Sequence, residues 1–308
     1  MNDTTNQQEI HPLIQALFAL VAAHRGAFRQ ERTYQRSVGL LLGELFNFAR
    51  HTVTQGLLAL GITEGDWSAW YRLFSHKRFE EEQLANCLLE QTLAHVAENE
   101  PYVVAVDGTS IHRSSLKMPG TSWLRDSRFS AFRPGIHRAQ RFLHGAWLTP
   151  IQEGFSRAIP LRFLPAYPAK ANPAETPNRR EWEAALVFLR WLRARLDQAK
   201  RTGQQILVLA DGGFDVLELW RGLPENVMLL TRTARNRALY SLPERDPHPG
   251  RGRPPSYGDP APSRPNGCIA ACATGPNNRW PCAASPSRCA TRSWVPSCAM
   301  ACPTSRSS

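Results

Sequence analysis

The sequence predicts an α/β protein with a helical region in front of it and a tail of different character behind it. Apolar residues recur at helical spacing from Leu13 onward, up to about residue 98. From about residue 100 the predicted order is three strands, helix, strand, helix, strand, which is typical of a layered α/β domain. From about residue 260 neither period is sustained. We therefore divide the chain into residues 1–99, 100–259 and 260–308.

The first region is predicted to consist of short helices joined by tight turns. The segment 40–61 is helical with breaks at Gly43 and Gly56, and Gly61 ends it. Residues 63–74 begin at a Thr63 cap, and residues 78–99 form a long amphipathic helix. This pattern fits a helix-turn-helix DNA reader and fits a plain helical bundle equally well, because periodicity does not separate the two.

The second region is predicted element by element. The first strand covers 102–107, and a long basic loop separates it from the next strand. Strands near 143–150 and 158–164 come next. A helix follows them, with Thr176 as cap, Pro177 in its first turn and Gly203 closing it. The last elements are a strand at 206–210, a short helix near 214–222 and a strand at 227–231.

Composition points to a polyanionic partner. The 308 residues carry a net charge of +11, and nucleic acid is the first such partner to consider. The longest apolar run, residues 13–23, is too short to cross a bilayer, and the polar N-terminus has no basic signal-peptide region. These features predict a cytoplasmic protein without a membrane partner.

The tail from about residue 260 contains no Asp, Glu or Lys and is rich in Pro, Ser, Ala, Cys and Arg. It is predicted to be disordered, although its Cys and Trp content is unusual for disorder. Its six cysteines have spacings that a zinc site disfavours, and no histidine accompanies them. The composition is that of GC-rich DNA translated in the wrong frame. The cysteines are Cys268, Cys272, Cys282, Cys289, Cys298 and Cys302.

Two aspartates are the candidate catalytic and metal-binding residues. Asp107 and Asp211 each end an apolar predicted strand and precede a glycine. Carboxylates gathered at one edge of a sheet suit Mg²⁺ or Mn²⁺, and a pair of such ions can cleave a phosphodiester. Either Asp-Gly pair alone would favour a turn, whereas the two together, at matching strand ends in one basic chain, favour metal binding. A phosphatase-like reading of residues 104–109 lacks its nucleophile, because Ala105 stands at that position.

Basic clusters flank these aspartates and are the candidate DNA-binding residues. Arginines bind phosphates, and the interleaved Phe129 and Phe132 can stack on bases. The segment 249–255 has an Arg-Gly-Arg-Pro core suited to a narrow minor groove. A solvated basic loop is the alternative for each cluster. The arginines are Arg125, Arg128, Arg133, Arg138, Arg141, Arg232, Arg235, Arg237, Arg251 and Arg253.

Taken together, the segments VAVDGTSI, LVLADGGFD, TRTARNRALY and GRGRPPSYG resemble bacterial insertion-sequence transposases of the DDE type over roughly residues 30–260. The resemblance implies an RNase-H-like mixed sheet in which two aspartates and a glutamate hold two Mg²⁺ ions. It assigns Asp107 and Asp211 as the first two acids. It also implies that transposon ends and target DNA are the partners, and that the protein acts as a homo-oligomer on DNA. Asp215 and Glu218 are interpreted as helix charges.

The chain departs from this family at the third acid. The family's glutamate lies on a helix after the fifth strand, and here no glutamate follows Glu244. We interpret this as an incomplete catalytic domain caused by a frameshift near Asn266, and we expect an impaired transposase. The alternative is a non-catalytic DNA-binding remnant that occupies transposon ends or inhibits intact copies.

Overall fold

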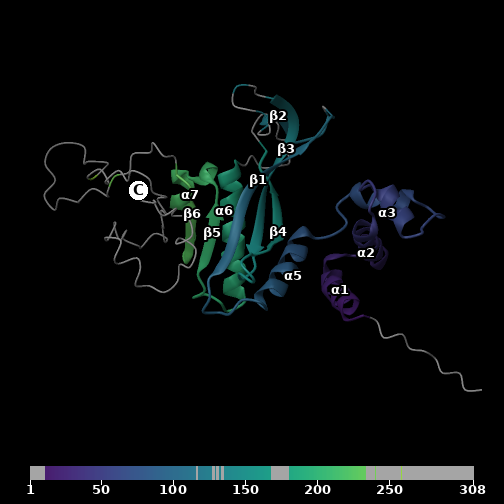
Figure 1. Ribbon diagram of the computed structural model, residues 1–308, viewed down its shortest axis with the longest axis horizontal. Coiled ribbons are helices and arrows are strands. Elements are labelled where there is room, and N and C mark those ends of the chain that lie inside the picture. The colour runs from purple at the N-terminus through teal and green to yellow at the C-terminus, as the bar shows by residue number, and fades with distance from the viewer. Residues whose placement is uncertain are drawn as a thin grey trace, which may run out of the picture.

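The structure is a computed structural model that describes residues 11–233, except residues 116, 127–128, 130–131, 133–134 and 168–179, together with Tyr240 and Gly258. It is a mixed α/β fold in which short N-terminal helices precede a mixed sheet (Figure 1). None of the described helices has the length and apolar character needed to span a membrane. The tail 260–308 lies outside the described residues.

The N-terminal region is helical, as predicted, but the glycines have a different role from the one expected. Gly43 lies within a helix, and so does Gly56. A Cβ at Gly43 would lie 3.1 Å from the backbone of Gly56, so the two glycines let two helices approach closely. The elements are α1 (Pro12–Ala23), η1 (His24–Ala27), α2 (Glu31–Phe46), α3 (Val53–Ala59), α4 (Ser68–Tyr71), η2 (Arg72–Phe74) and α5 (Glu81–Leu93).

The start of α4 corrects the predicted Thr63 cap. The helix begins at Ser68, and Oδ1 of Asp66 accepts a hydrogen bond of 3.0 Å from the Ser68 backbone N–H. A carboxylate accepts such bonds more strongly than a hydroxyl, and it also complements the positive helix N-terminus. Gly61, by contrast, has the positive φ of 70° that its predicted role as a helix stop requires.

A six-stranded sheet forms the centre of the second region. Its strand order is β2-β3-β1-β5-β6, and β4 pairs with β3. β3 runs antiparallel to β1, β2 and β4, whereas β1, β5 and β6 are parallel. The strands are β1 (Tyr102–His112), β2 (Thr121–Asp126), β3 (Gly135–Leu148), β4 (Ala158–Pro165), β5 (Ile206–Ala210) and β6 (Val227–Thr231).

The predicted long basic loop after residue 107 is largely strand. β1 continues to His112 because β3 goes on pairing with it as far as the His112–Ala139 pair. The parallel neighbour β5 leaves earlier, after the Val106–Ala210 pair. The end of β1 and the β2–β3 hairpin therefore extend beyond the rest of the sheet (Figure 1). These strands contain many polar residues and no long apolar run, so an apolar run does not indicate them in the sequence.

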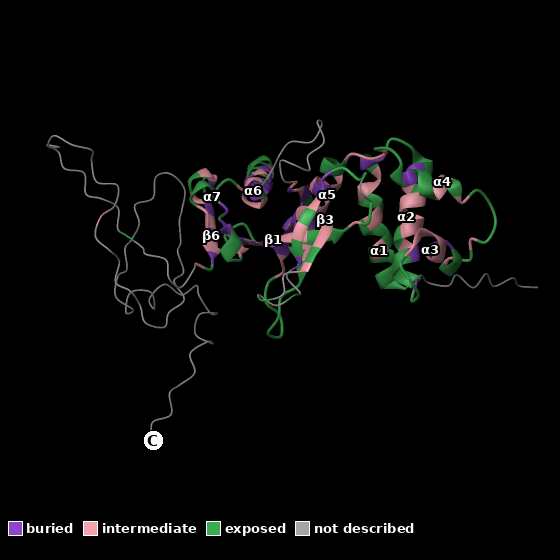
Figure 2. Cartoon of the chain, turned by 90° about the horizontal axis from the view of Figure 1, so that it is seen from above, coloured by how far each residue is buried: buried purple, intermediate pink, exposed green. Residues whose placement is uncertain are grey.

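One face of the sheet carries the core. The helix α6 (Glu181–Gln198) buries Phe188, Leu189 and Leu192 completely, and Gly145 of β3 leaves room for the Phe188 ring. Figure 2 shows buried residues along β1 and α6. The helix that the sequence predicts between the strands 158–164 and 206–210 is present here, although α6 begins at Glu181 and ends at Gln198. The expected cap Thr176 and Pro177 lie outside the described residues.

Two short helices lie between β5 and β6, and α5 lies beside α6. Gly212–Phe214 form η4 and Leu217–Gly222 form α7, close to the predicted short helix. Trp191 Nε1 of α6 donates a hydrogen bond of 3.0 Å to Oδ1 of Asn86 on α5. Through α5, the N-terminal helices are continuous with the core.

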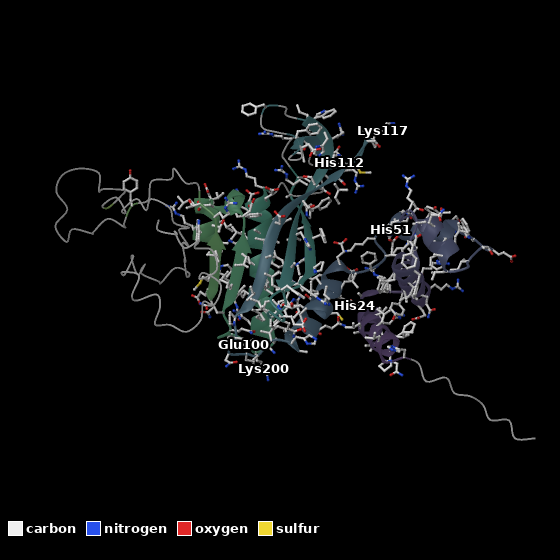
Figure 3. All side chains as sticks on the ribbon, viewed as in Figure 1. His24, His51, Glu100, His112, Lys117 and Lys200 are labelled. Atoms are coloured by element: carbon white, nitrogen blue, oxygen red, sulfur yellow. The ribbon has the colours of Figure 1, made fainter. Side chains whose placement is uncertain are left out.

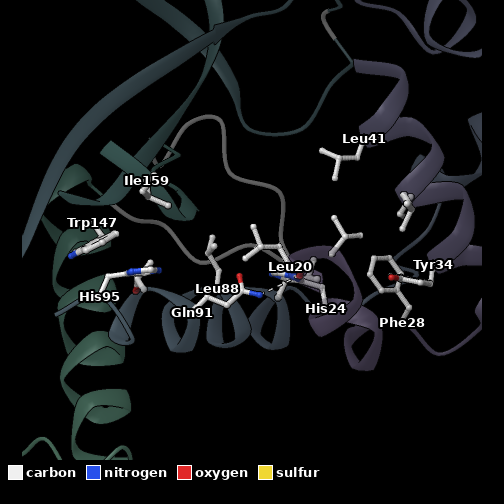
Figure 4. A pocket seen from close by; sticks show the side chains of 15 residues that line it. Leu20, His24, Phe28, Tyr34, Leu41, Leu88, Gln91, His95, Trp147 and Ile159 are labelled. Atoms are coloured by element: carbon white, nitrogen blue, oxygen red, sulfur yellow. Dashed lines mark hydrogen bonds between the residues drawn. The ribbon is translucent and has the colours of Figure 1, made fainter. Parts of the chain in front are cut away.

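An apolar cavity of about 480 Å³ separates the N-terminal helices from the sheet. Figure 4 shows Leu20 and Tyr34 on its N-terminal side, with His95 and Trp147 on the opposite side. The His95 and Trp147 rings stack with their centroids 6.3 Å apart. The lining has no cluster of charged groups, so this cavity does not bring catalytic residues together.

Candidate functional site

The structure places Asp107 and Asp211 side by side. Val106 of β1 pairs with Ala210 of β5, and the two aspartates are the next residues of these parallel strands. Because side chains alternate along a strand, both aspartates project from the same face of the sheet. Both are exposed. The prediction that Asp107 ends its strand is wrong, because β1 continues to His112. Asp107 instead lies where β1 loses its parallel neighbour β5.

Local hydrogen bonds fix both carboxylates. Oδ1 of Asp107 accepts from the Gly108 N–H at 2.8 Å, and Oδ1 of Asp211 accepts from the Gly213 N–H at 2.9 Å. The turn that the Asp-Gly pair indicated is therefore present at Asp211, which caps η4, whereas Asp107 and Gly108 lie within strand β1. Each bond uses one carboxylate oxygen, which leaves Oδ2 for another ligand. Neither local hydrogen bond excludes metal binding.

The backbone of Asp211 is also held from the neighbouring strand. The hydroxyl of Thr231, at the end of β6, donates to the Asp211 carbonyl oxygen. Thr231 is buried, and it pairs with Ala210 in the sheet. On the other side Gly212 approaches the Arg232 carbonyl, which a Cβ would meet at 3.2 Å. The position of Asp211 is thus set by β6 as well as by β5.

A third carboxylate, which the sequence did not reveal, approaches this site from the first turn of α6. Glu181 lies against Gly108, the residue after Asp107, and a Cβ at Gly108 would overlap Oε1 of Glu181. Glycine at this position therefore makes room for the glutamate. Residues 108 and 181 are far apart in the chain, so no local spacing indicates that they meet.

The charges around Glu181 confirm that it belongs to the same electrostatic cluster. Burial raises the pKa of Glu181, and the negative charges of Asp211 and Asp107 add to this rise. The Arg141 guanidinium opposes it, with Nε 3.3 Å from Oε1 of Glu181. The negative charges of the three carboxylates repel one another, and Arg141 offsets this repulsion at Glu181. A bound cation would relieve the remaining repulsion.

These residues fit a hard divalent cation. Carboxylate oxygens are the ligands that Mg²⁺ and Mn²⁺ prefer, and magnesium sites commonly use only one or two of them with waters and substrate phosphates. Among the described residues, however, Asp107, Asp211 and Glu181 do not form a group whose ligand atoms all lie within 4.8 Å. Such a group occurs elsewhere, at His112, Asp126 and His137.

The predicted DNA-binding arginines are only partly described. Arg125 and Arg232 are exposed, on β2 and directly after β6. Arg138 donates from Nε and Nη2 to Oγ1 of Thr121, at 3.0 and 2.6 Å. Arg141 contacts Glu181, as described above. The arginines that lie outside the described residues are Arg128, Arg133, Arg235, Arg237, Arg251 and Arg253.

An aromatic residue that the sequence analysis did not select joins these arginines. Trp123 is 66% exposed and pairs with Arg138 across the β2–β3 hairpin, while Arg125 pairs with Ile136. Because directly paired residues share a face, one face of the hairpin presents an aromatic ring between two arginines. The predicted stacking residue Phe132 is 96% exposed nearby. The sequence feature that could have indicated Trp123 is a large aromatic residue within an otherwise mostly polar segment, TSWLRD.

Glu218 is a helix charge as predicted, whereas Asp215 lies before the first turn of α7 and has a different role. Oδ1 of Asp215 accepts a hydrogen bond of 3.0 Å from the Trp220 indole nitrogen. Glu218 lies in the first turn of α7, where a negative charge is favoured. Asp215 therefore serves to position Trp220.

Comparison with known families identifies the class of protein. Residues 24–292 match the model of the DDE superfamily endonucleases, and the chain belongs to this family. Members are nucleases of the transposase type, which act on DNA and typically use divalent metal ions. No curated protein matches this chain. The match extends past residue 260, where the resemblance to insertion-sequence transposases ends, so the frameshift near Asn266 stays a prediction.

Proposed function

We propose that this protein is a DNA transposase that cuts transposon ends and joins them to target DNA by Mg²⁺-dependent phosphodiester hydrolysis and strand transfer. The observation that carries the proposal is the adjacent register of Asp107 and Asp211 on parallel strands. Membership of the DDE superfamily endonucleases supports the same chemistry. The resemblance to insertion-sequence enzymes supplies the more specific reaction.

In this proposal Asp107 and Asp211 hold Mg²⁺ or Mn²⁺ through the carboxylate oxygens that their local hydrogen bonds leave unused, and an intact site holds two ions. The bound cations would activate a water and stabilise the leaving oxygen of the phosphodiester. Glu181 supplies a third carboxylate from α6. Arg141 holds Glu181 in place and lowers the cost of its charge. Thr231 keeps Asp211 in register with Asp107.

We further propose that the activity of this chain is impaired. The glutamate that the insertion-sequence resemblance assigns to a later helix has no counterpart after Glu244. Glu181 comes from α6, which precedes β5 in the chain, and it lies against Gly108. The Arg141 guanidinium partly neutralises its charge. A site assembled in this way has a third carboxylate in a different position, and preorganised sites lose much of their activity when a ligand is displaced.

The experiment that tests the function is a Mg²⁺-dependent nicking assay on DNA carrying the element's own ends. The intact chain should nick this DNA slowly, and Asp107→Asn should abolish the nicking. The matched control is Asp215→Asn, which lies near Asp211 and preserves the acceptor for Trp220. Nicking that survives Asp107→Asn would assign the reaction to other residues or to a contaminant.

The alternative is a non-catalytic DNA-binding remnant that occupies transposon ends or inhibits intact copies. The exposed arginines and Trp123 of the β2–β3 hairpin favour it, because they suit DNA binding without any metal. In this case end-containing DNA is bound tightly, no nicking occurs with Mg²⁺ or Mn²⁺, and the purified chain inhibits an intact copy.

DNA is the partner in both proposals, with the chain acting in the cytoplasm as a homo-oligomer assembled on DNA. A phosphate contact from Arg125 predicts that Arg125→Ala weakens binding on all sequences and lowers the salt slope by about 1. Arg195→Ala is the control, since Arg195 lies near the end of α6 and pairs with Glu82. Gel-shift titrations at several salt concentrations measure both slopes.

A further inference from the structure

A second cluster of metal-ligating side chains lies at the far end of β1. His112 ends β1, Asp126 ends β2, and His137 lies in β3. One potential ligand atom from each of them lies within 4.8 Å of the others. Figure 3 shows His112 where β1 meets the protruding hairpin.

Strand register explains why these three residues meet. His112 pairs with Ala139, and Asp126 pairs with Gly135, so His137 lies between the two pairs on β3. Residues two apart on a strand share a face, and so do directly paired residues. All three side chains therefore project from the same face of the hairpin, opposite to the face that presents Trp123 and Arg125.

The environment of His137 is unusual for a histidine without a ligand. Its side chain is 15% exposed and that of Asp126 is 6% exposed. Within the described part of the chain, neither Nδ1 nor Nε2 of His137 has a hydrogen-bond partner. Nδ1 lies 3.5 Å from Oδ2 of Asp126, too far for a good hydrogen bond. Buried polar atoms normally have partners, and a site for an ion is one established explanation when they lack them.

We propose that His112, Asp126 and His137 bind a divalent transition-metal ion of the zinc class, with water in the fourth position. Two imidazole nitrogens and one carboxylate suit Zn²⁺, whereas Mg²⁺ prefers oxygen alone. Ligand atoms of a tetrahedral zinc site lie about 3.4 Å apart, which follows from Zn–N bonds of about 2.1 Å. The separation of Asp126 and His137 already matches, and His112 needs a small approach.

Binding would change the geometry of one pair of rings. The imidazoles of His112 and His137 now stack with their centroids 3.8 Å apart and their planes 16° from parallel. Nitrogens of parallel rings do not converge on one point, so the rings must open on binding. The exposed His112 is the ring with freedom to turn.

The ion would fasten the end of β1 to both strands of the hairpin. This hairpin protrudes from the sheet, and its side chains Trp123 and Ile136 are exposed. The ion would add bonds across three strands where these apolar side chains contribute little burial. The site differs from Asp107 and Asp211 in donors and in position, five residues further along β1, and it does not rest on the proposed function.

The experiment is a Co²⁺ titration of the full chain after removal of metals, followed by competition with Zn²⁺. We expect one equivalent of Co²⁺ with the visible spectrum of a nitrogen and oxygen site, displaced by Zn²⁺. A sulfur-to-metal band would instead report the cysteines of the tail. His112→Ala and Asp126→Asn should each weaken the affinity by at least about tenfold, because even outer partners of a metal contribute that much.

The control variant is His51→Ala, an exposed histidine paired with Glu44 in the N-terminal region, and it should bind Co²⁺ like the wild type. Far-UV circular dichroism checks that each variant is folded. A test independent of variants maps histidine carbethoxylation in the wild type, where Zn²⁺ should protect His112 and His137 but not His51. Equal affinity in all variants, a sulfur spectrum only, or no protection of these two histidines would overturn the proposal.

Discussion

β1 carries two polar clusters, and their comparison contrasts two candidate metal sites on one strand. At the first, Asp107 and Asp211 are exposed carboxylates on adjacent parallel strands, and Glu181 of α6 lies against Gly108. Around His112 the donors are two imidazoles and the buried Asp126. Oxygen donors at an open site suit a reactive Mg²⁺, whereas nitrogen donors around a buried carboxylate suit a structural ion.

The difference follows from which neighbours β1 has at each point. At Asp107 the parallel neighbour β5 ends, so the site opens towards solvent and substrate. At His112 the antiparallel strands continue, so Asp126 and His137 are shielded by the sheet while the His112 ring stays exposed. The open first cluster and the partly shielded second cluster are thus consequences of topology, and each of the following experiments tests that separation.

The largest effect is expected for the aspartates. Asp107→Asn and Asp211→Asn should each lower Mg²⁺-dependent nicking by at least about 100-fold, the usual loss when a group that stabilises the transition state is removed. Binding of Co²⁺ at His112 should not change. Nicking and Co²⁺ titration on the same preparations measure both, and loss of Co²⁺ binding would show that the clusters are not separate.

The next effect is expected for Glu181→Gln, which keeps the shape of the side chain and removes its charge. Mn²⁺ affinity, followed by electron paramagnetic resonance, should fall by about tenfold, since a carboxylate of the cluster is lost. The matched control is Glu183→Gln, in the same first turn of α6, whose carboxylate accepts from the Arg180 N–H. Equal Mn²⁺ affinity in both variants would remove Glu181 from the site.

A smaller effect is expected for Gly108→Ala. The new Cβ overlaps Oε1 of Glu181, and the flexible carboxylate must move away. Mn²⁺ affinity should fall by less than in Glu181→Gln, roughly threefold, because the charge is displaced rather than removed. Gly203→Ala is the control, since no atom lies within 4 Å of a Cβ there. A larger loss than for Glu181→Gln would show that Gly108 matters for another reason.

The smallest effect concerns the strand that both clusters share. Tyr102 begins β1 and is fully buried, and its hydroxyl lies 2.6 Å from that of Thr92. Burial raises the pKa of Tyr102, and the hydrogen bond with Thr92 and the charge of Arg201 only partly oppose this. The folded chain keeps the proton that the unfolded chain loses near pH 10, so the free energy of unfolding falls as pH rises through that value.

Tyr102→Phe should remove this contribution to the alkaline loss and should cost about 1 kcal/mol near neutral pH, the usual contribution of one hydrogen bond. Urea unfolding at about pH 8 and about pH 11 measures both effects. The ligand affinities of the two clusters should be unchanged. An identical alkaline loss in both proteins would mean that other groups cause it.

The sequence by itself determined much of this protein. The strands 206–210 and 227–231 lie where the apolar runs predicted them, and the buried face of α6 follows from helical periodicity. Asp107 and Asp211 were recognisable because each follows an apolar run in the sequence, and strand register places them side by side. These are local patterns, and local patterns persist when the chain folds.

Only the tertiary structure decided the rest. It brought Glu181 to Gly108, and it gathered His112, Asp126 and His137 from three strands. It also turned two predicted helix breaks into the contact of Gly43 with Gly56. Each of these meetings depends on strand or helix register, and a shift of one residue would send the side chains to the opposite face. Register is set by packing between distant segments, which the composition of any single segment does not encode.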